Sequence, residues 1–305
     1  MSAAMPAPGR PDGWRVAAVI VTYQRPEELR LVVDALEAQT RRPDHLIVFD
    51  NGGTIRADRS LKGSELPMEI ILSPSNVGGA GGFSRGLERA LAWQADWIWL
   101  LDDDAIPWPD ALANLIGALP GLPDRTGGVG VAVREYGRWA VRHRRRFCSW
   151  AGWEWPLARA RYRQVRAEID TASFVGFLVA AEAARAVALP DADLFMAFDD
   201  TDYSLRLRRA GWRLWLIPGA VVDHLRSPES RLHSSRLGSK HYYNIRNRLL
   251  VRRRYARCAA LVAIDGVLYG LLMWLVTGGW RSLASTRLLV RALRDGLSGR
   301  AGRLA

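Results

Sequence analysis

The chain has 305 residues, of which 49% are apolar and 24% charged, and this ordinary composition and length suit one large domain or a domain with a helical appendage. Its only cysteines, Cys148 and Cys258, are too few for a disulfide framework and do not have the spacing of a cysteine-rich metal site. The formal net charge of +12 is unevenly distributed along the chain. Residues 225–305 carry sixteen Lys and Arg against three acids, a net charge of +13, whereas the first 224 residues have a net charge of about −1.

Residues 1–13 are rich in Pro, Ala and Gly and lack the apolar segment of a signal peptide, so we expect a disordered leader before a cytoplasmic protein. Residues 14–22 contain the apolar run Val-Ala-Ala-Val-Ile-Val, which is typical of a strand buried on both faces. Pro26 then begins a helix predicted to end near Thr40, because proline suits the first helical turn. The next predicted elements are strands at 45–50, 68–72 and 97–101 and a helix that runs from the glycine-rich stretch 76–82 to about Trp93.

Strands that alternate with helices predict an α/β fold with a mostly parallel central sheet and helices on both faces. Ligands of such sheets bind at the carboxyl ends of the strands. Asp50, the 76–82 stretch and the triplet Asp102–Asp104 each follow a predicted strand, so we expect them to lie together at this edge of the sheet.

The pattern is less regular in the second half of the domain. We interpret residues 134–170, which hold several arginines and tryptophans, as a loop-rich insertion. The elements predicted after it are a strand at 174–180, a helix at 199–211 that a glycine closes, and strands at 213–217 and 221–224. The predicted domain therefore covers residues 14–238.

Residues 239–305 form a basic, apolar tail that we expect to be helical. Between Cys258 and Trp280 the only charged residue is Asp265, and the length of this run would suit a membrane span. Asp265 near its middle would cost about 3 kcal/mol in the bilayer, so we prefer an interfacial or re-entrant helix pair. The basic charge indicates an anionic surface, and the apolar run favours a membrane, because nucleic acid would account for the charge alone.

The strongest local motif is the acid triplet Asp102, Asp103 and Asp104. Adjacent carboxylates repel one another, and a divalent cation relieves this repulsion. Mg²⁺ and Mn²⁺ prefer oxygen ligands and often share a site with substrate phosphates. The alternative is a solvated acidic turn, but the position at the edge of the sheet favours a metal site, which His224 could complete as a neutral imidazole.

Two further motifs carry possible chemistry. The glycine stretch from Asn76 could let backbone amides approach a phosphate, and Arg85 could add a bidentate contact, although a simple turn is the alternative. Asp199 and Asp200 open a later helix. Their charges suit the helix dipole, but such carboxylates also suit a general base that deprotonates a sugar hydroxyl.

In this order the motifs resemble the family 2 glycosyltransferases, which have the GT-A fold, and the resemblance covers residues 16–224. The matching segments are Val-Ile-Val-Thr-Tyr-Gln-Arg-Pro at 19–26, Val-Phe-Asp-Asn at 48–51, the Asn76 stretch, Asp102–Asp104, Asp-Asp-Thr-Asp-Tyr at 199–203, Gly211-Trp212 and His224. Within the family, Pro-Asp-His-Leu-Ile-Val at 43–48 and Ala-Asp-Trp-Ile-Trp-Leu at 95–100 are similar to the actinobacterial galactofuranosyltransferases that initiate cell-wall galactan.

The resemblance implies an inverting transferase that uses UDP-galactofuranose, Mn²⁺ or Mg²⁺, and a polyprenyl-diphosphate-linked glycan acceptor at the cytoplasmic face of the cell membrane. By position it implies a metal site at Asp102, Asp104 and His224 and a catalytic base at Asp200. The implied donor site consists of Thr22, Arg25, Asp50, Asn76, Gly79, Arg85, Asp102 and Asp103, with Thr22 and Asp50 near the uridine. The residues placed at the acceptor are Asp199, Phe174 and Arg246.

Three alternatives stay open, as does the oligomeric state. A rhamnosyltransferase that uses dTDP-rhamnose shares nearly all of these motifs. A sugar nucleotidyltransferase would need a glycine-rich loop after the first strand, where this chain has Thr-Tyr-Gln-Arg-Pro at 22–26. A nucleic-acid-binding protein would use the basic tail, but we expect no nucleic-acid partner.

Overall fold

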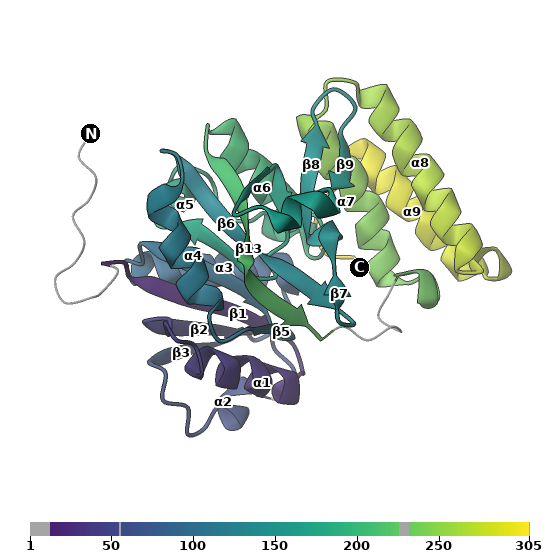
Figure 1. The fold of residues 1–305 in the computed structure, drawn as a ribbon. Helices are drawn as coiled ribbons and strands as arrows, with labels where there is room; N and C mark the ends of the chain where they lie inside the picture. The colour runs from purple at the N-terminus through teal and green to yellow at the C-terminus, as the bar shows by residue number, and fades with distance from the viewer. Residues whose placement is uncertain (1–12, 55, 226–231, 305) are drawn as a thin grey trace.

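The computed structural model describes residues 13–54, 56–225 and 232–304, so only Gly13 of the expected leader lies within the described residues. A central sheet with helices packed against it forms the larger part of the molecule (Figure 1). Three long helices from the C-terminal part of the chain stand beside this sheet (Figure 1).

The first half of the chain builds the parallel part of the sheet. Its elements are β1 (Val16–Thr22), α1 (Pro26–Glu37), β2 (His45–Asp50), α2 (Ala57–Ser60), β3 (Met68–Leu72), α3 (Gly78–Ala92) and β4 (Trp97–Asp102). β1 pairs in parallel with β2 and β4, and β2 pairs in parallel with β3. Every residue of β1 is buried, which explains its uninterrupted apolar sequence. The predicted strands are confirmed, and α1 ends somewhat earlier than expected.

The second half extends the sheet beyond β4. Its elements are β5 (Ala105–Pro107), α4 (Ala111–Ala118), the 3-10 helix η1 (Leu119–Gly121), β6 (Thr126–Glu135), β12 (Phe177–Ala180), α5 (Ala181–Arg185), η4 (Ala192–Leu194), α6 (Asp199–Arg209) and β13 (Arg213–His224). The sheet order is β10-β13-β6-β12-β4-β1-β2-β3. β13 is parallel to β6, whereas β12 is antiparallel to β4 and β6. The predicted α/β fold is confirmed, with β12 separating two parallel groups of strands.

The segment 134–170, which we expected to be loop-rich, contains several short elements. These are β7 (Arg138–Trp139), η2 (Val141–His143), β8 (Arg144–Cys148), β9 (Trp153–Pro156), η3 (Arg159–Arg163) and β10 (Ala167–Ile169), followed by β11 (Thr171–Ala172). β11, β8 and β9 form a second, three-stranded sheet. Arg144 attaches it to the main sheet, because its fully buried guanidinium donates hydrogen bonds to the carbonyls of Val131 at 2.9 Å and Val175 at 2.7 Å. Periodicity did not reveal these strands because they are short and rich in arginine.

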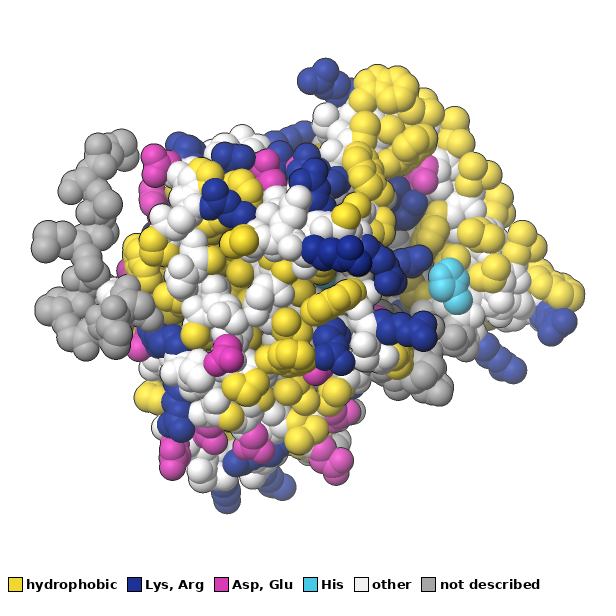
Figure 2. Space-filling view, viewed as in Figure 1, with side chains coloured by type: hydrophobic (Ala, Val, Ile, Leu, Met, Phe, Trp, Pro, Cys, Tyr) yellow, Lys and Arg dark blue, Asp and Glu magenta, His cyan; other side chains and the backbone are white. Residues whose placement is uncertain are grey.

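The tail is helical, as expected, and contains η6 (Leu232–Ser234), α7 (Ser239–Tyr255), α8 (Ala259–Val276), η7 (Gly279–Arg281) and α9 (Leu283–Ser298). By length and composition α8 could cross a membrane. Its one acid, Asp265, forms ion pairs with Arg248 at 2.8 Å and Arg252 at 2.7 Å, so this face of α8 is attached to α7. The buried residues of α8, Gly266 and Gly270 among them, face α7 and α9, and the face turned away from these helices is apolar and exposed, with Leu268 at 61% exposure (Figure 2).

Candidate functional site

The ends of the parallel strands lie level at one edge of the sheet. In the strand register, Thr22 pairs with Asp50 and Val21 pairs with Asp102. Asp50 is buried, and its carboxylate accepts hydrogen bonds from the backbone amides of Gly52 at 3.2 Å and of Ala57, the first residue of α2, at 2.9 Å. Asp102 ends β4, so the acid triplet begins where the strand leaves the sheet. The structure therefore brings Asp50 and the triplet to one edge, as the sequence predicted.

The turn after β4 is held by groups from the start of the chain. Asp103 accepts a hydrogen bond from the Thr22 hydroxyl at 2.8 Å and lies 3.0 Å from the Arg25 guanidinium. The same guanidinium lies 2.7 Å from Asp104. Burial raises the pKa of Asp103 to about 6, although Arg25 and Thr22 favour the charged form. Asp103 thus orients the turn and holds Arg25 beside Asp104.

Asp102, Asp104 and His224 offer one ligand atom each within 4.8 Å of one another. His224 comes from the end of β13, and its Nε2 lies 3.0 Å from Oδ1 of Asp104, a spacing that two neighbouring ligands of one ion can have. Two carboxylates and an imidazole form a donor set that suits Mn²⁺ or Mg²⁺. The residues present therefore fit a divalent cation.

The charges of this group are strongly linked. Burial raises the pKa of Asp102 to about 7, and repulsion from Asp104 adds to it. Burial also opposes the charge of Asp104, but hydrogen bonds from His224 and Arg25 outweigh it and lower the pKa of Asp104 to about 2. Burial lowers the pKa of His224, but its hydrogen bonds to Asp104 and Glu135 outweigh this and raise that pKa to about 10. A divalent cation that displaces the proton of His224 would therefore supply the positive charge that the protonated imidazole provides beside Asp104.

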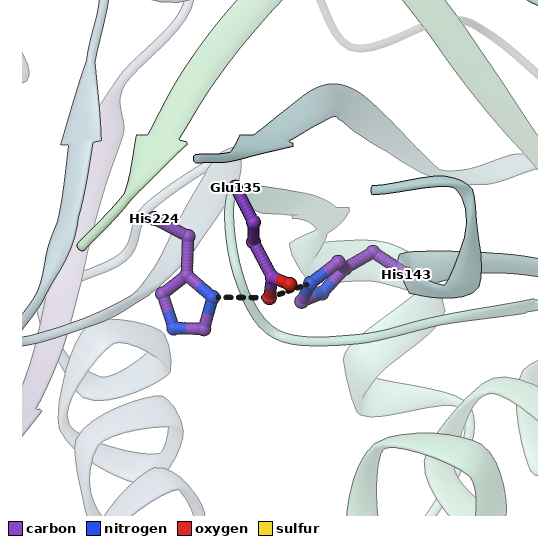
Figure 3. Close-up of side chains that lie close together, drawn as sticks. All are labelled: Glu135, His143 and His224. Carbon is purple, nitrogen blue, oxygen red and sulfur yellow. Dashed lines mark hydrogen bonds and ion pairs between the residues drawn. The ribbon is translucent and has the colours of Figure 1, made fainter. Parts of the chain in front are cut away.

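Glu135 lies between His224 and His143 (Figure 3) and orients His224 through Nδ1, the ring nitrogen that does not contact Asp104. Its Oε1 lies 3.1 Å from His224 Nδ1 and 3.1 Å from His143 Nε2. Hydrogen bonds from His143 and His224 hold the pKa of Glu135 well below its usual range. Burial lowers the pKa of His143 to about 4, so that ring is neutral at pH 7. Sequence reasoning missed Glu135 and His143, because both lie where we expected an insertion without a motif.

Of the two acids that open α6, Asp200 lines the same cavity as Asp104 and His224. Burial raises the pKa of Asp200, and the nearby charge of Arg145 opposes this rise. Arg145 Nη2 lies 3.6 Å from Asp200 Oδ2, and Arg145 also pairs with Glu154 at 3.2 Å. Asp199 is buried, and this burial, with repulsion from Asp200, raises its pKa well above the usual value. Asp200 therefore has a proton affinity above that of an exposed aspartate.

The chain that leads into α6 is strained. Phe195, Ala197 and Phe198 have φ values of 62°, 65° and 66°, in the left-handed region that side chains other than glycine rarely adopt. The side-chain amide of Asn247 in α7 donates hydrogen bonds to the carbonyls of Leu194, Met196 and Ala197, at 2.8 to 2.9 Å. Helix α7 thus braces the segment that positions Asp199 and Asp200.

A cavity of about 960 Å³ joins these groups. It is lined by Asp104, His224, Asp200 and Arg25 of the predicted set. The same cavity is lined by Glu135, His143 and Arg145, which come from β6, η2 and β8. Its volume is of the size that small-molecule sites have, and its polar groups converge from both halves of the chain.

The glycine-rich stretch has a packing role that the sequence did not predict. A side chain at Gly86 would place Cβ 2.3 Å from a methyl group of Val19, so Gly86 lets α3 approach β1 closely. At Gly78, where φ is +78°, Cβ would lie 2.0 Å from the carbonyl oxygen of Phe195. Asn76 accepts a hydrogen bond from the Gly78 amide at 2.8 Å, and Gly79 has open space around it.

Ten of the fourteen predicted site residues do not line this cavity, and three of these ten have contacts that differ from their predicted roles. Arg85 is exposed on α3, pairs with Glu88 at 3.5 Å, and lines a different hollow of about 700 Å³. Phe174 is buried against Phe83, with ring centroids 4.7 Å apart. Arg246 is fully buried and donates to the carbonyl of Leu194 at 2.9 Å. The expected acceptor contact of Arg246 is therefore wrong, because its guanidinium is enclosed by the protein.

Comparison with known proteins agrees with this geometry. A family model described as glycosyltransferase like family 2 matches residues 11–248. Galactofuranosyltransferase GlfT1 of Mycobacterium tuberculosis is 34% identical over 212 residues, which cover 64% of this chain and 65% of that protein, so the match spans just under two thirds of the relative. N-acetylglucosaminyl-diphospho-decaprenol L-rhamnosyltransferase of M. tuberculosis is 24% identical over 73% of this chain and 80% of its own.

A solved structure shares the fold. The structure of GalNAc-T7 with UDP, GalNAc and Mn²⁺ superimposes with a TM-score of 0.59 and 15% identity, over 78% of this chain and 48% of that chain. This likeness agrees with the α/β fold described above.

Proposed function

The chain belongs to the glycosyltransferase like family 2 and is a glycosyltransferase, and on that premise we propose that it transfers galactofuranose from UDP-galactofuranose to a lipid-linked glycan with inversion. The similarity to a galactofuranosyltransferase supports this donor. The observation that carries the proposal is that one cavity brings Asp104 and His224 together with Asp200. A cation and phosphate site then lies beside a carboxylate of raised pKa, which is the combination that sugar transfer needs.

Asp102, Asp104 and His224 would hold Mn²⁺ or Mg²⁺, which would act as a Lewis acid toward the leaving diphosphate. Glu135 keeps the imidazole of His224 turned toward Asp104 by accepting from its other ring nitrogen. Arg25 contacts Asp104 at the cation site, and from there its guanidinium would stabilise the negative charge that develops on the departing nucleotide.

Asp200 would act as the base. Its carboxylate takes the proton of the acceptor hydroxyl while the hydroxyl oxygen forms a bond to the anomeric carbon of the donor sugar. The bond between that carbon and the diphosphate oxygen breaks, and UDP leaves with the electron pair, so the configuration at the anomeric carbon inverts. Arg145 favours the ionised form of Asp200, because its positive charge opposes the rise in pKa that burial causes.

The remaining donor contacts follow from the strand ends. Thr22 and Asp50 lie level at the carboxyl edge, and we place the uridine beside them. Asn76 and Gly79, at the start of α3, are placed beside the ribose and diphosphate. Arg85 is not retained for this role, because its exposed side chain pairs with Glu88 and lines a different hollow. Asp103 serves the donor by holding Arg25 and the turn.

The acceptor is proposed to be linked to a polyprenyl diphosphate in cell-envelope synthesis. The rhamnosyltransferase relative is named for an acceptor of this kind, N-acetylglucosaminyl-diphospho-decaprenol. The exposed apolar face of α8 would lie in the plane of the membrane at its cytoplasmic face. A span is disfavoured, because Asp265 in the middle of α8 is held to α7 by two arginines.

The second candidate donor is dTDP-rhamnose, which the rhamnosyltransferase relative favours. The two are separated by offering the purified protein UDP-galactofuranose, UDP-galactopyranose and dTDP-rhamnose, each with Mn²⁺, and measuring nucleotide release. We expect release from UDP-galactofuranose above the other two. Preferential release from dTDP-rhamnose would replace the proposed donor.

A further inference from the structure

The mouth of the cavity carries cations that the site described so far does not use. Arg142, Arg159 and Lys240 line the same cavity as Asp104 and Asp200. All three are exposed, and within the described part of the chain none of them forms an ion pair. They differ in this from Arg25 and Arg145, whose charges already lie beside Asp104 and Asp200 of the site.

One of these cations, Arg142, lines the cavity of the reacting groups and also lies near the apolar helix α8. Arg142 belongs to η2, next to His143, and its charge acts on Tyr269 of α8. The β8–β9 hairpin that follows is joined to the start of α8, because the amide of Cys258 donates to the carbonyl of Trp150 at 3.0 Å. Trp150 is 61% exposed. Exposed apolar surface therefore continues from the hairpin along α8 (Figure 2).

We propose that Arg142, Arg159 and Lys240 bind the diphosphate of the acceptor lipid. This inference rests on the proposed function and adds the residues that recognise the acceptor. The donor diphosphate belongs with the cation at Asp102, Asp104 and His224, which leaves the unpaired cations for a second anion. A diphosphate held at the mouth would direct its sugar inward to Asp200 and its lipid outward over the hairpin and α8.

The test measures binding of two probes to the full chain with Mn²⁺: farnesyl diphosphate below its micelle concentration, and UDP. The variants are Arg142→Gln, Arg159→Gln and Lys240→Gln. Arg163→Gln is the matched control, because Arg163 lies on the same 3-10 helix as Arg159, is exposed, and does not line the cavity. Farnesol, which has the lipid without the diphosphate, shows what the apolar surface contributes.

Each cavity variant should weaken farnesyl diphosphate binding by about tenfold, as loss of a charge-assisted contact does. UDP and farnesol binding should stay unchanged, and Arg163→Gln should bind all three probes as the wild type does. Farnesyl diphosphate binding that is the same in all variants would overturn the inference. An equal loss of UDP affinity would also overturn it, because the cations would then serve the donor. Failure of the proposed function would show differently, as a wild-type protein that does not bind UDP.

Discussion

The Nε2 atom of His224 lies 3.0 Å from Oδ1 of Asp104, and this contact joins the last strand of the sheet to the turn after β4. Glu135 holds the other nitrogen of the ring at 3.1 Å. A histidine fixed in this way presents one nitrogen to a carboxylate pair and cannot rotate freely. The contact is the structural basis for the proposed cation site.

Cation binding should become tighter as the pH rises. The pKa of His224 is raised to about 10, so the ring is protonated at neutral pH and must lose its proton to become a ligand. Release of this proton alone makes the affinity rise about tenfold per pH unit, and the slope should be steeper below pH 7, where Asp102, whose pKa is raised to about 7, must also lose a proton. Titration of Mn²⁺ into the protein at pH 6, 7 and 8 measures this slope. An affinity that does not change with pH would exclude His224 as a ligand.

Arg145→Gln should move the acidic limb of the pH–rate profile to higher pH. Asp200 must be ionised to act as a base, so the rate falls as the pH decreases through its pKa. Burial raises this pKa and Arg145 lowers it, so removal of Arg145 raises it further. The control is Arg146→Gln, because Arg146 follows on the same strand but pairs with Asp170. A limb that stays in place in both variants would contradict the role given to Arg145.

Asn247→Ala should slow transfer without loss of UDP binding. The variant leaves the carbonyls of Leu194, Met196 and Ala197 without their shared donor, so the strained segment before α6 relaxes and Asp200 moves. The carbonyl of Leu194 keeps its bond from Arg246, but the loss of the donor to Met196 and Ala197 should lower the free energy of unfolding by about 2 kcal/mol. The turnover number, UDP affinity and thermal unfolding are measured. Unchanged turnover in a destabilised variant would show a purely structural role.

Leu268→Glu and Leu272→Glu should each weaken binding to vesicles that contain phosphatidylglycerol. Both side chains are exposed on the apolar face of α8, where a carboxylate would oppose both insertion and contact with anionic lipid. Leu31→Glu in α1 is the control, because Leu31 is also exposed but lies on a different helix. Wild-type protein that withstands extraction at high pH would instead indicate a spanning helix.

The sequence was sufficient to predict the strands whose residues are buried on both faces, because their apolar runs are uninterrupted. It also placed the acid triplet correctly, since Asp102 follows such a run and topology brings parallel strand ends together. His224 could be proposed as a ligand from its place at the end of a predicted strand, but a single histidine has no pattern of its own, and the family resemblance added support for this role.

Other features depend on packing that one-dimensional pattern does not contain. Gly78 and Gly86 belong to a stretch that resembles a phosphate-binding loop in sequence. In the structure, any side chain at Gly78 would clash with Phe195, and any side chain at Gly86 would clash with Val19. In sequence Arg246 could be a free cation, yet in the structure its buried guanidinium donates a hydrogen bond to the carbonyl of Leu194. Glu135 reaches the site because β6 lies beside β13, a long-range pairing that no local motif signals.

The central claim is that Asp200 and the cation site act together on a bound nucleotide sugar. The most direct test compares wild type and Asp200→Asn for transfer of labelled galactofuranose from UDP-galactofuranose to a polyprenyl-diphosphate glycan, with Mn²⁺ or with EDTA. We expect transfer by wild type with Mn²⁺ alone, and a loss of at least about a hundredfold in Asp200→Asn with UDP binding retained. Full transfer by Asp200→Asn, or by wild type in EDTA, would contradict the account.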